Sequence, residues 1–194
     1  SLGYTTGKAA SRLLNVDVNV PLLFIASAIP DIDLLIPALK HRGPTHSAII
    51  ICVLFLPIFI AYRKKATPYF IALIQHSILG DYLTGPTQLL WPLTVHWYGV
   101  GIKMTSLNSI IMEWTLFLTS LITMLKTKDA RTLFEDHTSN LLLSIPLFTV
   151  LLPTLLKFPI SVPSELIIPH ITFLTIFTLS ILTDLKHMLE KRIA

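Results

Sequence analysis

Long apolar runs, separated by short polar or proline-containing segments, fill most of the chain. A helix needs roughly 20 apolar residues, within a range of about 17–25, to cross the hydrocarbon core of a bilayer. Several runs reach or approach that length. They are 20–39, 47–62, 68–91, 107–125, 140–157 and 164–184, with Pro159 and Pro163 between the last two.

This pattern predicts an all-α fold, a polytopic integral membrane helical bundle with about six membrane segments after a short amphipathic N-terminal helix. Run 47–62 is short for a span, so we expect other parts of the protein to shield some of it. We predict a single membrane-embedded domain over residues 1–194. Its motif-bearing half is residues 1–114, and residues 115–194 read as generic apolar helices.

The composition favours a membrane protein over a soluble one. Hydrophobic residues make up 53% of the chain and charged residues 13%, and the mean hydropathy is +0.70. Soluble globular proteins have about 45–50% apolar and about 25% charged residues. The single cysteine, Cys52, can form no disulfide within the chain, and one cysteine is too few for a cysteine-based zinc site.

The basic residues predict which segment ends face the cytoplasm, because Lys and Arg are enriched in cytoplasmic loops. If 63–65 ("RKK") faces the cytoplasm and the segments alternate, eleven of the 15 basic residues fall on that side. They are spread over separate loops and form no single patch, so we expect no nucleic-acid partner. The sequence specifies no protein partner. The basic residues on the opposite side are Lys40, Arg42, Lys103 and Lys157.

Six ionisable side chains lie in or beside these apolar runs at a similar predicted depth. Each charged group costs at least about 2.5–3.5 kcal/mol at mid-bilayer, so such residues are rare and usually functional. At about 1.5 Å per helical residue, all six reach the membrane half opposite the cytoplasm. They are Asp31, Asp33, His46, His76, Asp81 and Glu113.

Two short motifs decide which of these side chains can meet. In "PDID" the aspartates lie on different faces of a helix, so one can bind a metal while the other orients a ligand or caps a helix. In "HSILGD", His76 and Asp81 are about 140° apart on a regular helix. Gly80 between them would permit a bend or a π-bulge that brings the two together.

Carboxylates mixed with imidazoles, without thiolates, suit zinc, manganese or iron. We therefore expect one or two divalent ions, with zinc preferred. Each residue also has a simpler interpretation. The aspartates could cap a broken helix, the histidines could be satisfied core residues, and Glu113 could pair with Arg42. His41 and Arg42 could be interface anchors.

Four blocks of sequence resemble one family: "PDID", "HRGPTHS", "HSILGD" with "GPTQLLWPL", and Glu113 opening the next apolar run. In this order, over about residues 28–114, they resemble the YdjM-like membrane-bound metal-dependent hydrolases. In the arrangement of its motifs, the family is similar to zinc phospholipase C and P1-type nucleases. Family members commonly carry an additional histidine near the start, and this sequence has none before His41. The resemblance implies metal ligands among Asp31, Asp33, His46, His76, Asp81 and Glu113.

Together these observations predict a membrane metallohydrolase that acts on a lipid-borne ester, with a phosphoester preferred. A bound metal would activate water, His41 or a non-ligating Asp33 would move protons, and Arg42 would hold the phosphate. One alternative is a metal or proton transporter that uses the same cluster, and another is a non-catalytic membrane scaffold subunit. A transporter would need polar residues that continue towards the cytoplasmic side, where the runs are nearly all apolar.

Overall fold

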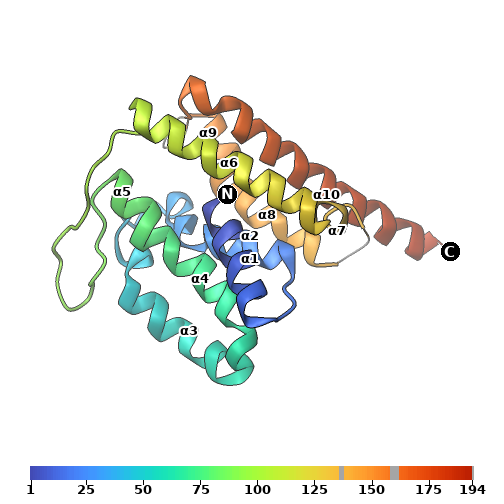
Figure 1. Ribbon diagram of the computed structural model, residues 1–194, viewed down its shortest axis with the longest axis horizontal. Helices are drawn as coiled ribbons and strands as arrows, with labels where there is room; N and C mark the ends of the chain where they lie inside the picture. Colours follow the sequence, from blue (N-terminus) through green and yellow to red (C-terminus); the bar gives the residue numbers. More distant parts are fainter. Residues whose placement is uncertain (136–137, 158–161, 194) are drawn as a thin grey trace.

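The computed structural model describes residues 1–135, 138–157 and 162–193, and within them the protein is helical (Figure 1). The α-helices are α1 (Leu2–Leu14), α2 (Val20–Ala28), α3 (Ala48–Tyr62), α4 (Thr67–Gln75), α5 (Tyr82–Thr84), α6 (Leu107–Thr127), α7 (Asp129–Thr132), α8 (Ser144–Pro146), α9 (Leu152–Leu155) and α10 (Ile167–Ile193). Tighter 3₁₀ turns are Ile29–Leu35, Pro44–His46, Arg63–Lys65, Thr138–Leu143 and Ser164–Leu166, and π-helical segments are His76–Asp81 and Leu147–Leu151. The predicted all-α fold is confirmed for these residues.

Two helices in the described ranges are long and apolar enough to cross a membrane, α6 and the stretch Ser164–Lys191 that contains α10. In the most apolar part of each, only 22% of the residues are buried, so most of their apolar surface is not covered by protein. Ser139–Leu155 is apolar but shorter. Helix length therefore supports two membrane segments and does not establish the predicted six.

The helix boundaries differ from the hydrophobic runs in two places. Run 68–91 stays helical only to Thr84, because Gly85 is extended and Pro86 cannot donate the backbone hydrogen bond that a helix requires. Residues 85–106 then form a long loop, drawn as a thin green trace at the left of Figure 1. Two backbone hydrogen bonds between Thr87 and Tyr98 close this loop. Run 20–39 tightens into a 3₁₀ turn at Pro30 and ends at Leu35. The predicted break at Pro159 lies outside the described residues.

The N-terminal helix α1 is more central than its amphipathic pattern suggested. It packs closely on α2 and α4 because glycines face both neighbours. A Cβ on Gly7 would come within 2.7 Å of Leu23 Cδ2 and 2.9 Å of the Pro68 carbonyl oxygen. Small residues allow membrane helices to approach this closely. The close approach fixes the relative positions of α2 and α4, the helices that lead into the acid–histidine residues.

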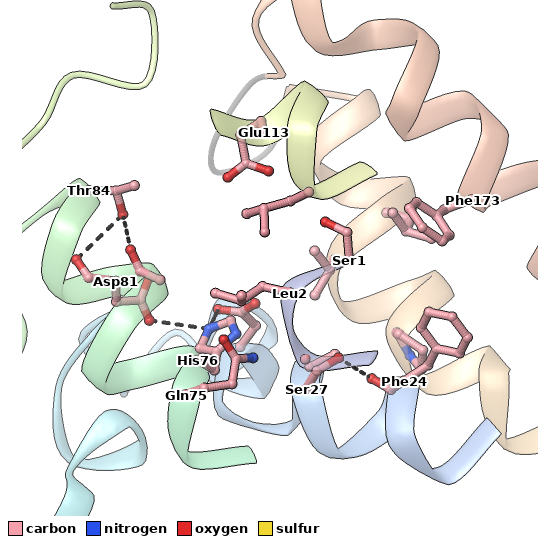
Figure 2. A pocket seen from close by; sticks show the side chains of 18 of the residues that line it. Ser1, Leu2, Phe24, Ser27, Gln75, His76, Asp81, Thr84, Glu113 and Phe173 are labelled. Carbon is pink, nitrogen blue, oxygen red and sulfur yellow. Dashed lines mark hydrogen bonds and ion pairs between the residues drawn. The ribbon is translucent and has the colours of Figure 1, made fainter. Parts of the chain in front are cut away.

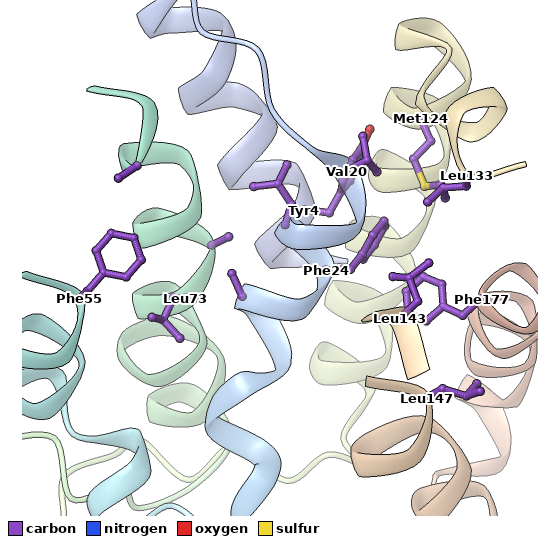
Figure 3. Close-up of a cluster of buried hydrophobic side chains, with 14 of the residues drawn as sticks. Tyr4, Val20, Phe24, Phe55, Leu73, Met124, Leu133, Leu143, Leu147 and Phe177 are labelled. Carbon is purple, nitrogen blue, oxygen red and sulfur yellow. The ribbon is translucent and has the colours of Figure 1, made fainter. Parts of the chain in front are cut away.

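One apolar core joins the first and second halves of the chain (Figure 3). Phe24 of α2 is its centre: its ring stacks on Tyr4 at 5.1 Å and meets Phe177 of α10 edge-on at 5.0 Å. A hydrogen bond from Tyr4 Oη to Asp129 Oδ2 (2.7 Å) and an ion pair between Lys8 and Asp129 (2.8 Å) tie α1 to the turn after α6. The second half is therefore packed directly against the motif-bearing half.

Gly7→Ala tests this packing. We expect a loss of about 1–3 kcal/mol in the free energy of unfolding, because one contacted atom is a backbone oxygen that cannot rotate away. The control is Gly80→Ala, since a Cβ there meets no atom within 4 Å. Thermal or denaturant unfolding in detergent measures both variants. Equal stability of the two would contradict the close approach of α1 to α4.

Candidate metal centre

Three departures from α-helical geometry build the acid–histidine cluster. Asp31 and Asp33 lie in the 3₁₀ turn after α2, and both are almost fully buried, with 9% and 2% of their surfaces exposed. His46, fully buried, ends the short 3₁₀ turn Pro44–His46 that precedes α3. His76 and Asp81 begin and end the π-helical segment that continues α4.

The π-helix confirms the predicted bulge in "HSILGD" and explains how two residues five positions apart meet. A π-helix bonds residue i to i+5, so the ends of one turn lie on the same face. His76 Nε2 is 3.2 Å from Asp81 Oδ2. A regular α-helix would have pointed the two side chains apart.

Four side-chain atoms surround one point: His46 Nε2, His76 Nε2, Asp31 Oδ1 and Asp81 Oδ2, all within 4.8 Å of one another. The nitrogen–oxygen distances are 3.4 Å (His46–Asp31), 3.1 Å (His46–Asp81), 3.2 Å (His76–Asp31) and 3.2 Å (His76–Asp81). Zinc ligands lie about 2.0–2.2 Å from the ion, which places tetrahedral neighbours about 3.3–3.6 Å apart. The spacing matches a four-ligand site after small adjustments.

The opposite side of His46 fixes the direction in which its free nitrogen points. His46 Nδ1 is 3.2 Å from Asp33 Oδ2 and 3.0 Å from Thr45 Oγ1, and Thr45 donates its own proton to Asp33. From this network we assign the ring proton to Nδ1, which leaves the Nε2 lone pair facing the two carboxylates. Metal-binding histidines are typically oriented by such a carboxylate. Asp33 therefore has an orienting position, one of the two roles that the sequence left open for these aspartates.

A cation would also satisfy an otherwise unpaired buried atom. Asp81 Oδ2 is shielded from solvent and receives no hydrogen bond from the described residues. Two carboxylates at this separation repel each other when both are ionised, unless positive charge lies between them. The donor set, its spacing and this atom all fit a divalent metal.

His41 and Arg42 border the cluster without joining the four atoms. His41 Nδ1 is 3.0 Å from Asp33 Oδ1 and, with Asp31, Asp33 and His46, forms a second group with metal-ligand spacing. Arg42 Nε lies 3.1 Å from Asp81 Oδ1, and its Nη2 donates to Thr84 Oγ1 at 2.8 Å. A Cβ at Gly85 would meet Arg42 Nη1 at 1.9 Å, so only glycine leaves room for this guanidinium.

Glu113 reaches the same cavity but not the cluster. The cavity, of about 420 Å³, is lined by Asp31, His76 and Asp81 and also by Glu113 of α6. Figure 2 shows His76 and Asp81 on one side of it and Glu113 on another. No described ion pair joins Glu113 to Arg42 or to the cluster; Arg42 instead pairs with Asp81. Glu113 as a metal ligand stays a prediction, which would require an ion deeper in the cavity.

Two kinds of site residue were missed by sequence reasoning. Thr45 and Thr84 orient Asp33 and Arg42, and Thr45 could have been found because it lies inside "HRGPTHS". The apolar far wall of the cavity comes from the second half of the chain and includes Val150 and Phe173. Apolar residues carry no chemical signature, so no sequence signal marked them. On the same wall, His170 Nε2 lies within hydrogen-bond distance of the Leu151 carbonyl oxygen and of Thr154 Oγ1.

The fold and the site define a helical membrane protein with a buried acid–histidine cluster of metal-ligand geometry. The chain belongs to the YdjM inner membrane protein family, whose model matches residues 1–158 and so includes every residue of the cluster. No curated protein and no solved structure matches the chain.

Metal analysis of purified protein tests the centre. We expect about one equivalent of a first-row divalent metal in the wild type, since the four side chains provide enough nitrogen and oxygen ligands to hold one ion. His46→Ala should lose it, whereas Asp33→Asn should weaken affinity about 10–100-fold, as changes behind a ligand do. The control is His96→Ala, in the exposed loop. Metal-free wild type that was never exposed to chelator, or equal retention in all three variants, would contradict the assignment.

Proposed function

We propose that this protein is an integral membrane, metal-dependent hydrolase that cleaves a lipid-borne phosphoester. The observation that carries the proposal is the set of four ligand atoms, with nitrogen–oxygen distances of 3.1–3.4 Å, at one end of a cavity with an arginine beside them. A structural metal site would have no need of a cavity of about 420 Å³. Hydrolysis needs room for a substrate next to the ion.

In this mechanism Asp31, His46, His76 and Asp81 hold a divalent ion, and Asp33 keeps the His46 ring in its binding orientation. When bound, such an ion polarises the scissile group and lowers the pKa of a water molecule. His41 is placed to exchange protons: Asp33 anchors its Nδ1, and its ring lines a neighbouring cavity of about 500 Å³. General acid–base catalysis requires a group within hydrogen-bond reach, directly or through one water.

Arg42 is the anion-binding group of the proposal. Its guanidinium borders both cavities and is fixed by Thr84 on one side and Asp81 on the other. Guanidinium groups bind phosphate by two parallel hydrogen bonds, which supports a phosphoester over a neutral ester. Arg42 adopts a positive φ of 64°, so the backbone accepts an uncommon conformation to place the group there.

We further propose that the chain crosses the membrane about six times, with the cluster in the half opposite the cytoplasm. The properties of α3 support its assignment as one of the shorter spans, because its side chains are almost all apolar and only Ile51 and Phe55 are buried. Lipid would cover the exposed remainder. In Figure 1 the turn 63–65 lies at the bottom, the end of α6 lies to the right of centre, and the loop 85–106 lies at the far left. The two basic segments therefore both lie away from the loop, which agrees with the distribution of basic residues.

The structure disfavours the transporter alternative. Between the cluster and the basic turn, the buried residues of α2 are apolar, and those of α4 are apolar except for Gln75, which directly precedes His76. An ion pathway would require polar groups or water along this route. A scaffold would require no open cavity at the cluster.

Turnover on a panel of lipid phosphoesters tests the proposal. Asp81→Asn should abolish hydrolysis while the protein stays folded, because the amide keeps the shape but loses the charge that offsets the metal. Arg42→Lys should weaken binding of the anionic substrate and retain the metal, because lysine lacks the planar fork. The control is again His96→Ala. Wild-type turnover by Asp81→Asn would rule out this mechanism, and altered ion flux without any hydrolysis would favour the transporter.

Cysteine labelling tests the orientation. Cys52 is replaced by alanine, and single cysteines are placed at Lys64 and Lys103, both exposed in the structure. A membrane-impermeant reagent added to intact cells should label position 103 and not position 64, as the positive-inside rule requires. Labelling of position 64 alone would reverse the orientation, and labelling of both would break the alternation of segments.

A further inference from the structure

The cavity at the cluster continues into a second one. This second cavity, of about 260 Å³, extends between α6 and α10 as far as Val162 and Pro163. The two share wall residues from three elements: Glu113 of α6, Val150 and Leu151 of the π-helical segment, and Phe173 of α10. The acid–histidine cluster therefore lies at one end of a continuous space, and side chains of the second half of the chain, such as Leu151, Leu166 and Phe173, line the other end.

Apolar side chains line most of this far end. Phe24, Leu116 and Phe173 line the first cavity, and Phe117 and Leu166 line the second. Two of its polar side chains bond to backbone carbonyl groups. The His170 ring nitrogen Nε2 lies 2.6 Å from the Leu151 carbonyl oxygen, and Thr154 donates to the Val150 carbonyl oxygen at 2.6 Å. A ligand group placed there would find an apolar surface and few free hydrogen-bond partners.

We infer that this space binds one acyl chain of the substrate lipid, and this inference rests on the proposed function. The phosphate would lie at Arg42 and the cluster, and the chain would run past Glu113 between α6 and α10. Glu113 sets the direction, because its carboxylate at the junction repels a phosphate and leaves the apolar end to the chain. Residues 138–193, which read as generic helices, thereby become part of substrate binding.

The volumes indicate a single chain. At roughly 30 Å³ per non-hydrogen atom, the share of one molecule in liquid water, the first cavity holds about 14 atoms and the second about nine. That is enough for a phosphate and one chain of moderate length, and too little for two chains. We therefore expect a lipid with one chain inside and any second chain left in the bilayer, or a single-chain lipid phosphate.

Leu116→Trp is the variant that fills the space, and Leu118→Trp is the matched control. Both residues lie on α6, but Leu116 lines the cavity and Leu118 is 47% exposed on the outer surface. The same side chain is added in each case, so general effects of tryptophan on α6 cancel. Val150→Phe provides a second blocking variant from a different helix, in case Leu116→Trp fails to fold.

The first readout needs no turnover. A long-chain alkyl phosphate with a diazirine near the chain end is photolysed with the full-length protein in nanodiscs, and adducts are mapped by mass spectrometry. We expect adducts at Val150 or Phe173 in the wild type and in Leu118→Trp, reduced about tenfold in Leu116→Trp, since each buried CH₂ is worth roughly fourfold in affinity. Labelling of Leu54, 70% exposed on α3, should not change. Adducts at Leu54 alone would overturn the inference.

The second readout separates the inference from the proposed function. For phosphoesters that differ only in chain length, the ratio of kcat/KM for long over short chains should fall about tenfold in Leu116→Trp and stay at the wild-type value in Leu118→Trp. An unchanged ratio in Leu116→Trp and Val150→Phe, with active enzyme, would overturn the chain site and leave the hydrolase standing. If the wild type hydrolyses none of the phosphoesters, the proposed function fails, and the photolabelling still decides whether a chain occupies the cavity.

Discussion

This structure depends on one constraint: two imidazole nitrogens and two carboxylate oxygens are held out of water with nitrogen–oxygen distances of 3.1–3.4 Å. Without a cation, the lone pair of His46 Nε2 faces two anionic oxygens, and Asp81 Oδ2 has no hydrogen-bond donor. Buried like charges are among the most costly arrangements in a protein. A divalent ion would turn the same arrangement into a bonded shell, which is the reason for our proposal that the cluster binds a metal.

The surrounding backbone departs from regular helix wherever the cluster needs it. A 3₁₀ turn that starts at Ile29 buries two aspartates two positions apart, and a π-helix brings His76 and Asp81 to one face. Arg42 takes a positive φ, and Gly85 leaves space for its guanidinium. Such irregular geometry is stable only when the neighbouring structure holds it in place. Here the close packing of α1 on α2 and α4 provides that support.

Much of the site could be predicted from the sequence because charge is costly in apolar segments. Predicted depth brought Asp31, His46, His76 and Asp81 to one level, and the structure brings them together. Depth alone could not show that Glu113 stops short of the cluster, since side-chain direction depends on how α6 packs. Hydropathy also placed residues 85–91 in a helix, because it does not register that Gly85 and Pro86 end one. The apolar wall of the cavity had no sequence signal, because its residues are those of any buried helix.

The most direct test of the account is X-ray absorption spectroscopy on purified protein, at the absorption edge of whichever metal it contains. The account predicts a first-row divalent ion with about four nitrogen and oxygen neighbours at about 2.0–2.2 Å and no sulfur. The outer-shell pattern of two imidazoles should disappear in His46→Ala. Sulfur in the first shell, or an ion surrounded by water alone with no imidazole signal, would contradict the claim that this cluster binds the metal.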